Sequence, residues 1–259
     1  MKKIWTVLLA VVMLGSLATT AGCSKDAAET GSREKFVFAN SGAYKPFSFD
    51  EGGQIVGFDV DIANEIAKRL DREPVMNSPV PFDSLIQGLK AGKYDALVAS
   101  HGITDERAKV VDFSRPYYRS GAQIFVGEDT TDIGGSADLK GKKIGVVKAS
   151  TYLDLAESLT DSDKVTTYDS DVIALQDLTT GRIDAVITDK LVGLVARNEA
   201  GLKINAVGDP LQQDEMGVIV QKGDTQLLND INKALDDMIA DGTYEEISMR
   251  WFGENILGE

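Results

Sequence analysis

The sequence contains only one cysteine and one histidine among its 259 residues. A single cysteine excludes a disulfide within the chain, and one residue of each type excludes a zinc cluster built from cysteine and histidine. A nucleophile pair of cysteine and histidine would need these two residues to meet in space, which leaves little room for that chemistry. We therefore expect neither a metal site nor a cofactor.

Positive charge is also scarce, because 27 Lys and Arg residues stand against 41 Asp and Glu residues, and the formal net charge is -14. Such a balance repels a phosphate backbone, so nucleic acid is not an expected partner. Hydrophobic residues make up 43% of the chain and charged residues 26%, which is typical of a folded soluble protein. The chain is therefore expected to build a hydrophobic core.

The hydrophobic segment at the N-terminus is short. Lys2 and Lys3 precede the stretch IWTVLLAVVML at 4–14, and small residues then lead to Cys23. This order is typical of a secretory signal, and the stretch is too short to span a bilayer comfortably as a mature helix. The residues before Cys23 resemble a bacterial lipobox, although Thr20 stands where that pattern usually has Leu. The resemblance implies cleavage before Cys23 and lipidation of its sulfur and new amino group.

Residues 24–34 contain no large apolar side chain and are expected to form a tether. We therefore assign residues 1–22 to a signal peptide and residues 23–34 to a lipidated tether. Cleavage removes two positive charges and changes the net charge to -16. The alternative interpretation of Cys23 is that it packs inside the protein as a small apolar side chain.

After residue 35 the apolar residues alternate between strand and helix patterns, which indicates an α/β fold. FVFA at 36–39 predicts a short strand, and 57–70 predicts a helix with Asp59 as a cap in its first turn. A helix, a glycine and a strand that begins with Asp-Ala are predicted within 82–99 and again within 171–189. This recurrence suggests two lobes of related construction.

Seven segments that occur in order carry a family resemblance. They are ANSGAYKPFSF (39–49), GFDVDIA (57–63), FDSLIQGLKAGKYDALVA (82–99), ITDERAKVVDFSRPYY (103–118), DLKGKKIGVV (138–147), LTTGRIDAVITD (178–189) and DGTYEEISMRWFG (241–253). Together they resemble the extracellular solute-binding proteins of amino-acid ABC importers, which have the type II periplasmic-binding fold. The resemblance covers nearly all of the chain that follows the tether.

This resemblance implies two α/β lobes joined by a hinge of two crossing strands. The implied boundaries are 35–117 with 218–259 for lobe one, and 122–213 for lobe two. The connectors would lie at 118–121 and 214–217, where Gly121 and Gly217 suit a hinge whose φ and ψ must change.

The function implied by the resemblance is the capture of a polar amino acid between two closing lobes, without covalent chemistry. The closed form would be presented to an ABC permease in the membrane. We expect a monomer outside the cytoplasmic membrane, anchored through Cys23, with the amino acid and the permease as its partners.

An amino acid needs paired donors for its carboxylate and an acidic group for its ammonium. Arg107 follows a buried strand, and strand ends open into the crevice of an α/β sheet. In the family the arginine of this T-x-x-R pattern binds the ligand carboxylate, and its threonine, here Thr104, adds a hydrogen bond. The residues alone favour a solvated charge beside Asp105 and Glu106, whereas the resemblance favours the ligand role.

Asp189 ends an apolar strand and should emerge at the mouth of lobe two. The matching aspartate in the family binds the ligand ammonium, and the alternative is an N-cap for the helix that begins near Leu191. Ser150 and Thr151 begin a helix whose amide groups suit a carboxylate, a role compatible with ordinary capping. Ala149 stands where the family usually has glycine.

Tyr44 and Phe82 match the aromatic positions that sandwich the ligand side chain in the family, and core packing is their alternative. Ser41 stands where several members that bind cationic or amide side chains have an acidic residue. Ser100 and Gly102 are predicted to face the pocket. Because side chains alternate along a strand, His101 between them should point away from it. The predicted ligand-binding residues are Ser41, Tyr44, Phe82, Ser100, Gly102, Thr104, Arg107, Ser150, Thr151 and Asp189.

Two other functions stay open at this point. The same fold resembles that of cyclohexadienyl dehydratases, whose chemistry needs a general acid with a raised pKa. A sensor for a receptor is the third hypothesis, disfavoured because no second apolar span precedes Glu259. The charge of the ligand side chain is also open, because Asp214 and Glu215 favour a cation and Ser41 does not.

Overall fold

The computed structural model describes residues 34–258 of the chain. Strands and helices alternate along this part of the sequence, which confirms the predicted α/β class. The predicted signal peptide, the lipidation site at Cys23 and the tether up to residue 33 lie outside the described residues. Within residues 34–258, no helix is both long and apolar enough to cross a membrane.

Eight strands form one mixed sheet in the order β5-β1-β6-β11-β7-β10-β8-β9. They are β1 (Lys35–Ala39), β5 (Glu73–Asn77), β6 (Ala96–Gly102), β7 (Val111–Gly127), β8 (Ile144–Val147), β9 (Val165–Tyr168), β10 (Ala185–Asp189) and β11 (Ile204–Gln221). Strands β5, β1 and β6 are parallel, and so are β10, β8 and β9. We call the part around the first three strands the first half and the part around the other three the second half. A separate small sheet contains β2 (Ala43–Tyr44), β3 (Ser48–Glu51) and β4 (Gln54–Val56).

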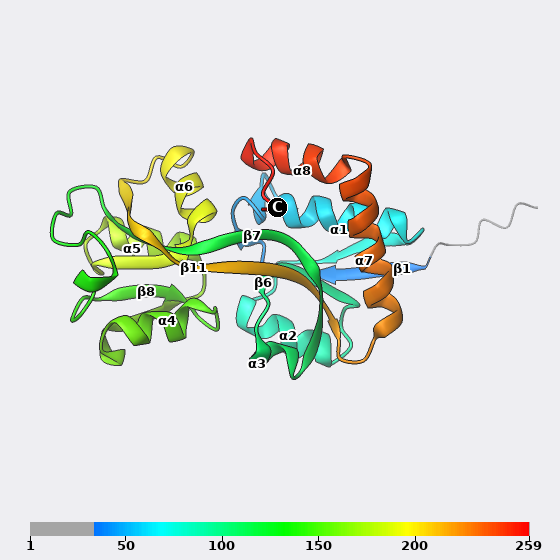
Figure 1. The fold of residues 1–259 in the computed structure, drawn as a ribbon, viewed down its shortest axis with the longest axis horizontal. Coiled ribbons are helices and arrows are strands. Elements are labelled where there is room, and N and C mark those ends of the chain that lie inside the picture. Colours follow the sequence, from blue (N-terminus) through cyan, green and yellow to red (C-terminus); the bar gives the residue numbers. More distant parts are fainter. Residues whose placement is uncertain (1–33, 259) are drawn as a thin grey trace, which may run out of the picture. The chain divides into compact units, whose positions relative to one another are not determined.

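The long strands β7 and β11 lie side by side as antiparallel neighbours and run through both halves (Figure 1). The predicted connectors, 118–121 and 214–217, fall within these two strands, and the exact lobe boundaries stay a prediction. Gly121 allows the strands to approach closely, because an added Cβ would lie 2.5 Å from the carbonyl oxygen of Gln212. At this position, the glycine is required by close packing and not by a positive φ.

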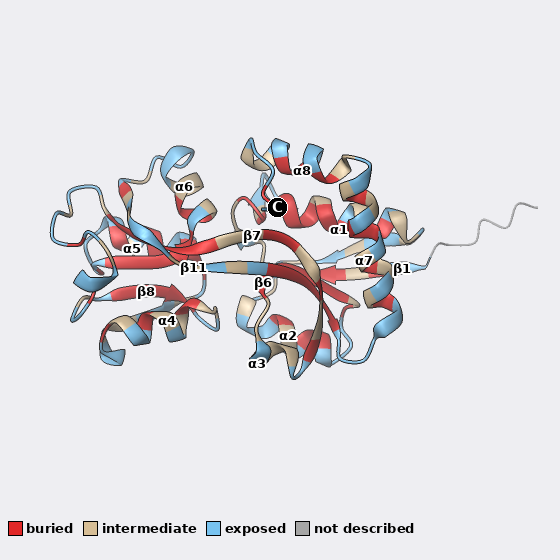
Figure 2. Ribbon diagram, viewed as in Figure 1, coloured by how far each residue is buried: buried red, intermediate tan, exposed pale blue. Residues whose placement is uncertain are grey.

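Helices lie on both faces of each half of the sheet (Figure 1). They are α1 (Phe58–Arg69), α2 (Phe82–Lys90), α3 (Asp105–Ala108), α4 (Tyr152–Leu159), α5 (Asp171–Thr179), α6 (Lys190–Asn198), α7 (Thr225–Ala240) and α8 (Thr243–Phe252). In the first half, Phe36 and Ile62 belong to the core under α1 and α7, and Leu85 belongs to the core under α2. In the second half, Ile144 belongs to the core that includes Tyr152 of α4, and Leu175 of α5 belongs to a separate core. Figure 2 shows that buried residues gather along the strands of the large sheet. Each half therefore has its own hydrophobic core.

The predicted helices and strands agree with these elements, but the predicted role of Asp59 was wrong. The N-cap of α1 is Gly57, and no side chain caps this end of the helix with a hydrogen bond. Asp59 is instead fully buried and accepts a hydrogen bond from Ser100 Oγ at 2.9 Å. The physical reason is that Asp59 lies on the helix face that packs against the sheet, and a cap would face the solvent.

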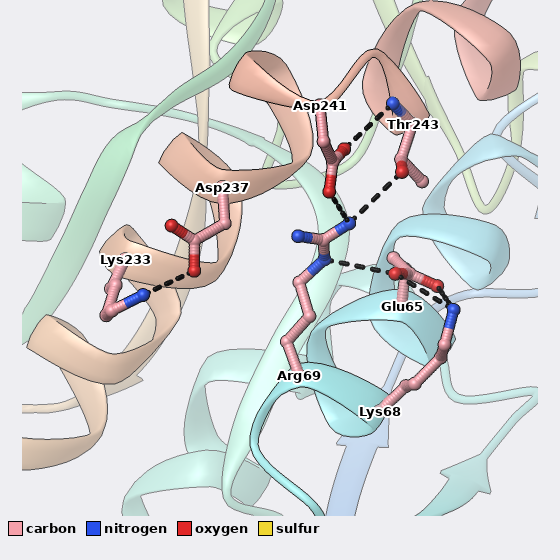
Figure 3. Close-up of polar contacts among 7 residues, drawn as sticks. All are labelled: Glu65, Lys68, Arg69, Lys233, Asp237, Asp241 and Thr243. Atoms are coloured by element: carbon pink, nitrogen blue, oxygen red, sulfur yellow. Dashed lines mark hydrogen bonds and ion pairs between the residues drawn. The ribbon is translucent and has the colours of Figure 1, made fainter.

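Arg69 ties the end of α1 to the turn between α7 and α8 (Figure 3). Its Nη2 donates to Asp241 Oδ2 at 2.8 Å and to Thr243 Oγ1 at 3.1 Å. Its Nε donates to Glu65 Oε1 at 3.0 Å, and the side chain is 17% exposed. These contacts join segments that are far apart in the sequence.

We expect Arg69→Ala to lower Tm by about 2 to 6 °C, because three hydrogen bonds of a mostly buried guanidinium are lost. Lys233→Ala is the matched control, since Lys233 pairs with Asp237 one turn further along the same helix and is 74% exposed. Its effect should be below about 1 °C. Differential scanning calorimetry measures both Tm values. Equal decreases in Tm would show that the contacts of Arg69 stabilise the protein no more than an exposed ion pair does.

Candidate functional site

A cavity lies between the loop after β1, β6 and α2 of the first half and the loops after β8 and β9 of the second half. Its empty space, including the part open to solvent, is about 590 Å³. Most of the predicted ligand-binding residues line it, namely Ser41, Tyr44, Phe82, Ser100, Gly102, Arg107, Ser150 and Thr151. Thr104 and Asp189 lie outside this lining.

Arg107 bridges the two sides of the cavity. Its Nη1 donates to the carbonyl oxygen of Gly102 at 2.9 Å, and its Nη2 donates to that of Ala149 at 3.0 Å. A guanidinium carries five N–H donors, so further donors are available for a bound carboxylate. Burial lowers the pKa of Arg107 and nearby Asp214 raises it, but the group stays cationic near neutral pH.

Thr104 supports Arg107 and does not face the cavity. It is the N-cap of α3, and its Oγ1 accepts a hydrogen bond from the backbone N–H of Arg107 at 3.2 Å. This contact fixes the start of the short helix that carries the guanidinium. The T-x-x-R pattern therefore acts here through capping of the backbone.

Ser100 is held at the cavity by a buried network that the sequence did not reveal. Its Oγ donates to Asp59 Oδ2 at 2.9 Å, and its backbone N–H donates to the hydroxyl of Tyr117 at 3.0 Å. The same hydroxyl donates to Asp59 Oδ1 at 2.6 Å. Burial raises the pKa of Asp59 from 3.8 to about 7, although both hydrogen bonds lower it. The network stabilises Ser100 in a left-handed conformation, with φ of 53°.

The loop after β8 brings Ala149, Ser150 and Thr151 to the opposite side of the cavity. Ala149 has φ of 59°, which is the left-handed conformation. The glycine that the family usually has at this position would adopt it freely, whereas for alanine it costs roughly 1 to 2 kcal/mol. Ser150 Oγ accepts a hydrogen bond from the backbone N–H of Tyr152 at 3.3 Å. Close approach is preserved on the facing strand, where a Cβ on Gly102 would lie 3.4 Å from Thr151 Cγ2.

Asp189 ends β10 and is completely buried. It is the N-cap of α6, with Oδ1 accepting from the N–H of Leu191 at 2.8 Å and from Ser120 Oγ at 2.7 Å. Its other oxygen, Oδ2, has no hydrogen-bond partner among residues 34–258. Burial raises the pKa of Asp189 from 3.8 to about 7, and the two hydrogen bonds oppose that rise. The capping role and a free carboxylate oxygen therefore coexist in one residue.

Sequence reasoning missed the residues that follow β9. Asp169, Ser170 and Asp171 line the cavity, and Asp171 is buried. Thr188 donates a hydrogen bond to Asp171, and burial raises the pKa of Asp171 to about 6. The available signal was a polar triplet between a strand and the N-terminus of a helix, which is a usual position for a binding loop.

Tyr152 is a second residue that the sequence did not single out. It lines the cavity from the first turn of α4, and its hydroxyl donates to Asp214 Oδ2 at 3.0 Å. Gln212 Nε2 donates to the other carboxylate oxygen of Asp214 at 2.7 Å. The contact joins the cavity wall to β11, within the predicted connector.

The aromatic lining is supported by stacking. Tyr44 stacks on Phe47 with ring centroids 5.2 Å apart, and Phe82 stacks on His101 at 4.5 Å. His101 is 1% exposed and lies behind Phe82, outside the cavity lining. Burial, followed by the charge of Arg107, lowers the pKa of His101 well below its usual 6.5. His101 is therefore a neutral packing residue at physiological pH.

A metal site is not found in the described part of the chain. No group of three or more His, Cys, Asp or Glu residues between 34 and 258 could hold a metal ion. The cavity lining is instead amphipathic, with the cation Arg107 on one side and the carboxylates Asp169 and Asp171 on the other. This arrangement suits a small molecule that carries both charges.

Residues 36–254 match the family of bacterial extracellular solute-binding proteins, family 3. Because this match covers most of the chain, the protein belongs to that family, and the predicted resemblance is confirmed.

Individual relatives and structures agree with this assignment. The chain is 33% identical to the probable amino-acid-binding protein YxeM of Bacillus subtilis (strain 168), over 100% of this chain and 98% of the relative. It is 38% identical to the ABC transporter arginine-binding protein 1 of Escherichia coli (strain K12), over 85% and 91% of the two chains. The crystal structure of the ancestral amino acid-binding protein AncCDT-1, a precursor of cyclohexadienyl dehydratase, has a TM-score of 0.78 at 34% identity, over 84% and 95%. The predicted type II periplasmic-binding fold is thereby confirmed.

Proposed function

We propose that this protein captures a polar amino acid in the cavity and delivers it to an ABC importer. Two charged residues from opposite halves carry the proposal. Arg107 lines the cavity and has further N–H donors. Asp189 lies outside the lining, but its buried Oδ2 has no partner among residues 34–258, and it interacts electrostatically with Tyr44 and Tyr152 of the lining. A zwitterion would satisfy both groups at once, and a buried ionisable oxygen without a partner is otherwise costly. The family and the amino-acid-binding relatives support the same function.

In this proposal the ligand carboxylate binds Arg107 together with the amide groups at Ser150 and Thr151. The ligand ammonium binds Asp189 Oδ2, and Ser100 and the carbonyl oxygen at Gly102 are available as further polar partners. Tyr44 and Phe82 provide the walls for the ligand side chain. Because the groups come from both halves, affinity and closure would be one event.

The side chain of the ligand is proposed to be cationic. Asp169 and Asp171 line the cavity, and Asp171 is buried. Asp189, which interacts electrostatically with Asp171, is the residue proposed to bind the ligand ammonium. Ser41, which replaces an acidic residue of several family members, lies in the same lining. The acidic partner for a basic side chain would thus come from the second half. A relative named for arginine binding supports this ligand class.

The test is a melting-shift panel of the twenty amino acids followed by calorimetry of Asp171→Asn. We expect the largest shifts with L-arginine or L-lysine, because ligand binding raises Tm in proportion to affinity. Asp171→Asn should weaken L-arginine binding about 10- to 100-fold, the loss of one charged hydrogen bond, and L-glutamine binding less than about threefold. Asp163→Asn, on an exposed turn, is the matched control. An equal loss for both ligands would contradict a cationic side chain at Asp171.

The proposed setting is outside the cytoplasm, in keeping with a family of extracellular solute-binding proteins. The signal and the lipobox-like residues before Cys23 support export and a lipid anchor, with release of the amino acid to a membrane permease. We propose that the protein acts as a monomer, since one chain supplies both sides of the cavity. Metabolic labelling with a palmitate analogue, compared with Cys23→Ser, tests the anchor.

A dehydratase activity is the second candidate. It is favoured by the raised pKa of Asp171, a carboxyl group in the cavity that burial brings to about 6, and by similarity to a precursor of cyclohexadienyl dehydratase. Binding is preferred because the relatives are named as amino-acid-binding proteins. Turnover of prephenate or arogenate by the purified protein would reverse this choice.

A further inference from the structure

Ser120 contacts the buried carboxylate of Asp189 from the hinge strand β7. Ser120 Oγ donates to Asp189 Oδ1 at 2.7 Å. The N–H of Leu191 donates to the same oxygen at 2.8 Å. Both hydrogen bonds therefore fall on Oδ1, and Oδ2 has no partner within the described residues.

The sheet register explains why Ser120 reaches this carboxylate. Asp189 on β10 lies opposite Ala122 on β7, and Ser120 is two residues from Ala122. Residues two apart in a strand point to the same face, so Ser120 is the diagonal neighbour of Asp189. The contact is therefore built into the pairing of β7 with β10. It also lies within the predicted connector 118–121.

Two donors on one oxygen restrict the orientation of the carboxylate. The Leu191 bond is the ordinary cap of α6 and fixes Oδ1 near the helix axis. The Ser120 bond comes from a different strand and fixes the carboxylate from the other side. A rotation of less than a half-turn about the Cβ–Cγ bond would lengthen both contacts, and a half-turn would only exchange two equivalent oxygens and restore the same arrangement. Oδ2 is consequently the oxygen available to a ligand.

The titratable side chains found to interact electrostatically with Asp189 are tyrosines and aspartates. They are Tyr44 of β2, Tyr118 of β7, Tyr152 of α4, Asp171 of α5 and Asp214 of β11. Burial raises the pKa of Asp189, the two neighbouring aspartates raise it further, and the Ser120 hydrogen bond is the leading effect that lowers it. No cation within the described chain is found among these influences. Ser120 is thus the main side-chain donor that stabilises the carboxylate form.

We infer that Ser120 is a positioning residue for ligand binding, which orients the carboxylate of Asp189 and presents its Oδ2 to the ligand ammonium. The inference rests on the proposed ammonium role of Asp189. It assigns to the hinge strand a direct electrostatic contribution to affinity, in addition to its mechanical role. Because Ser120 also lies opposite Asp214 on β11, the two hinge strands meet at this point.

The first test measures ionisation of Asp189 without any ligand. The ¹³Cγ resonance of Asp189 is followed by carbonyl-detected NMR from pH 5 to pH 9.5 in the parent and in Ser120→Ala. We expect the midpoint in Ser120→Ala to lie about one pH unit higher, since a hydrogen bond to the charged form is lost. Ser120→Thr keeps the hydroxyl and should restore the parent midpoint. An unchanged midpoint in Ser120→Ala would overturn the inference.

The second test measures the affinity for L-arginine by calorimetry at pH 6.5, 7.5 and 9. A shift of one unit predicts binding about eightfold weaker at pH 6.5, about threefold weaker at pH 7.5, and nearly unchanged at pH 9. A purely structural defect would weaken binding by a similar factor at every pH, and that result would contradict positioning. Ser158→Ala is the matched control, because Ser158 Oγ donates only to Leu155 of its own helix turn on an exposed surface.

Asp189→Asn separates this inference from the proposed function. If Asp189→Asn bound L-arginine as well as the parent did, the ammonium assignment would be wrong, and the positioning role would fail with it. If Asp189→Asn lost binding while Ser120→Ala kept the parent pH profile, only the positioning role would be wrong. The NMR midpoint does not depend on any ligand, so it decides the electrostatic part in either case.

Discussion

Arg107→Ala should weaken binding of the best amino-acid ligand by roughly two to three decades. Removal of one partner of a buried, hydrogen-bonded charge pair costs about 3 to 5 kcal/mol. Arg107 also joins Gly102 to Ala149 across the cavity, so the substitution removes a contact between the two sides. Calorimetry with the ligand identified in the amino-acid panel measures the loss.

Two further variants make this result specific. Arg107→Lys keeps the charge but not the planar pair of donors, and it should recover only part of the lost affinity. Arg182→Ala is the matched control, since Arg182 pairs with Asp177 at the surface and is 71% exposed. If Arg107→Ala bound the ligand as tightly as the parent, the carboxylate assignment would be wrong.

The ligand-free protein should become less stable as the pH rises from 5 to 8. Asp59, Asp171 and Asp189 are buried, and burial raises the pKa of each to between about 6 and about 7. Between pH 3.8 and these values the folded state binds more protons than the unfolded state. The free energy of unfolding therefore falls with increasing pH in this window, by about 1.4 kcal/mol per unit and per group.

His101 opposes this trend over part of the range. Burial lowers the pKa of His101, so only the unfolded state gains its proton below about pH 6.5. Because three carboxyl groups lower the free energy of unfolding and one imidazole raises it, we expect this free energy to fall by a net amount on the order of 4 kcal/mol from pH 5 to pH 8. Urea unfolding at several pH values measures it.

Asp59→Asn should reduce this net loss by more than half, because Asp59, with a pKa of about 7, contributes about 2.7 kcal/mol of it between pH 5 and pH 7. Its amide can still accept from Tyr117 and donate to Ser100, so the fold should be retained. Asp112→Asn is the matched control, since Lys222 lowers the pKa of Asp112 and the group is ionised in both states above pH 5. Stability that rose between pH 6.5 and pH 8 in the parent would contradict the raised pKa values.

Half of the residues that line the cavity could be predicted, because local patterns mark strand ends. Arg107, Ser150 and Thr151 follow apolar strands directly, and side chains at such ends meet in the crevice of an α/β sheet. Asp169 and Asp171 follow β9, which has no continuous apolar run. The absence of that run removed the signal that a strand end was near. These two residues were therefore found only in the structure.

The prediction that Asp59 caps the helix was wrong for a different reason. Its position in the first turn of a helix fits a capping residue, and the sequence does not say which helix face meets the sheet. The partners Ser100 and Tyr117 are 41 and 58 residues away along the chain. Only packing of α1 against β6 and β7 brings them together.

The sequence by itself determined the α/β class, the family, the acidic charge and half of the cavity lining, because these depend on composition, periodicity and short motifs. The tertiary structure decided the state of each charge. Burial raises the pKa values of Asp59, Asp171 and Asp189, and the register of β7 with β10 gives Asp189 its Ser120 partner. Such effects depend on which atoms surround a group and on how much water reaches it, and residues distant in the sequence supply both.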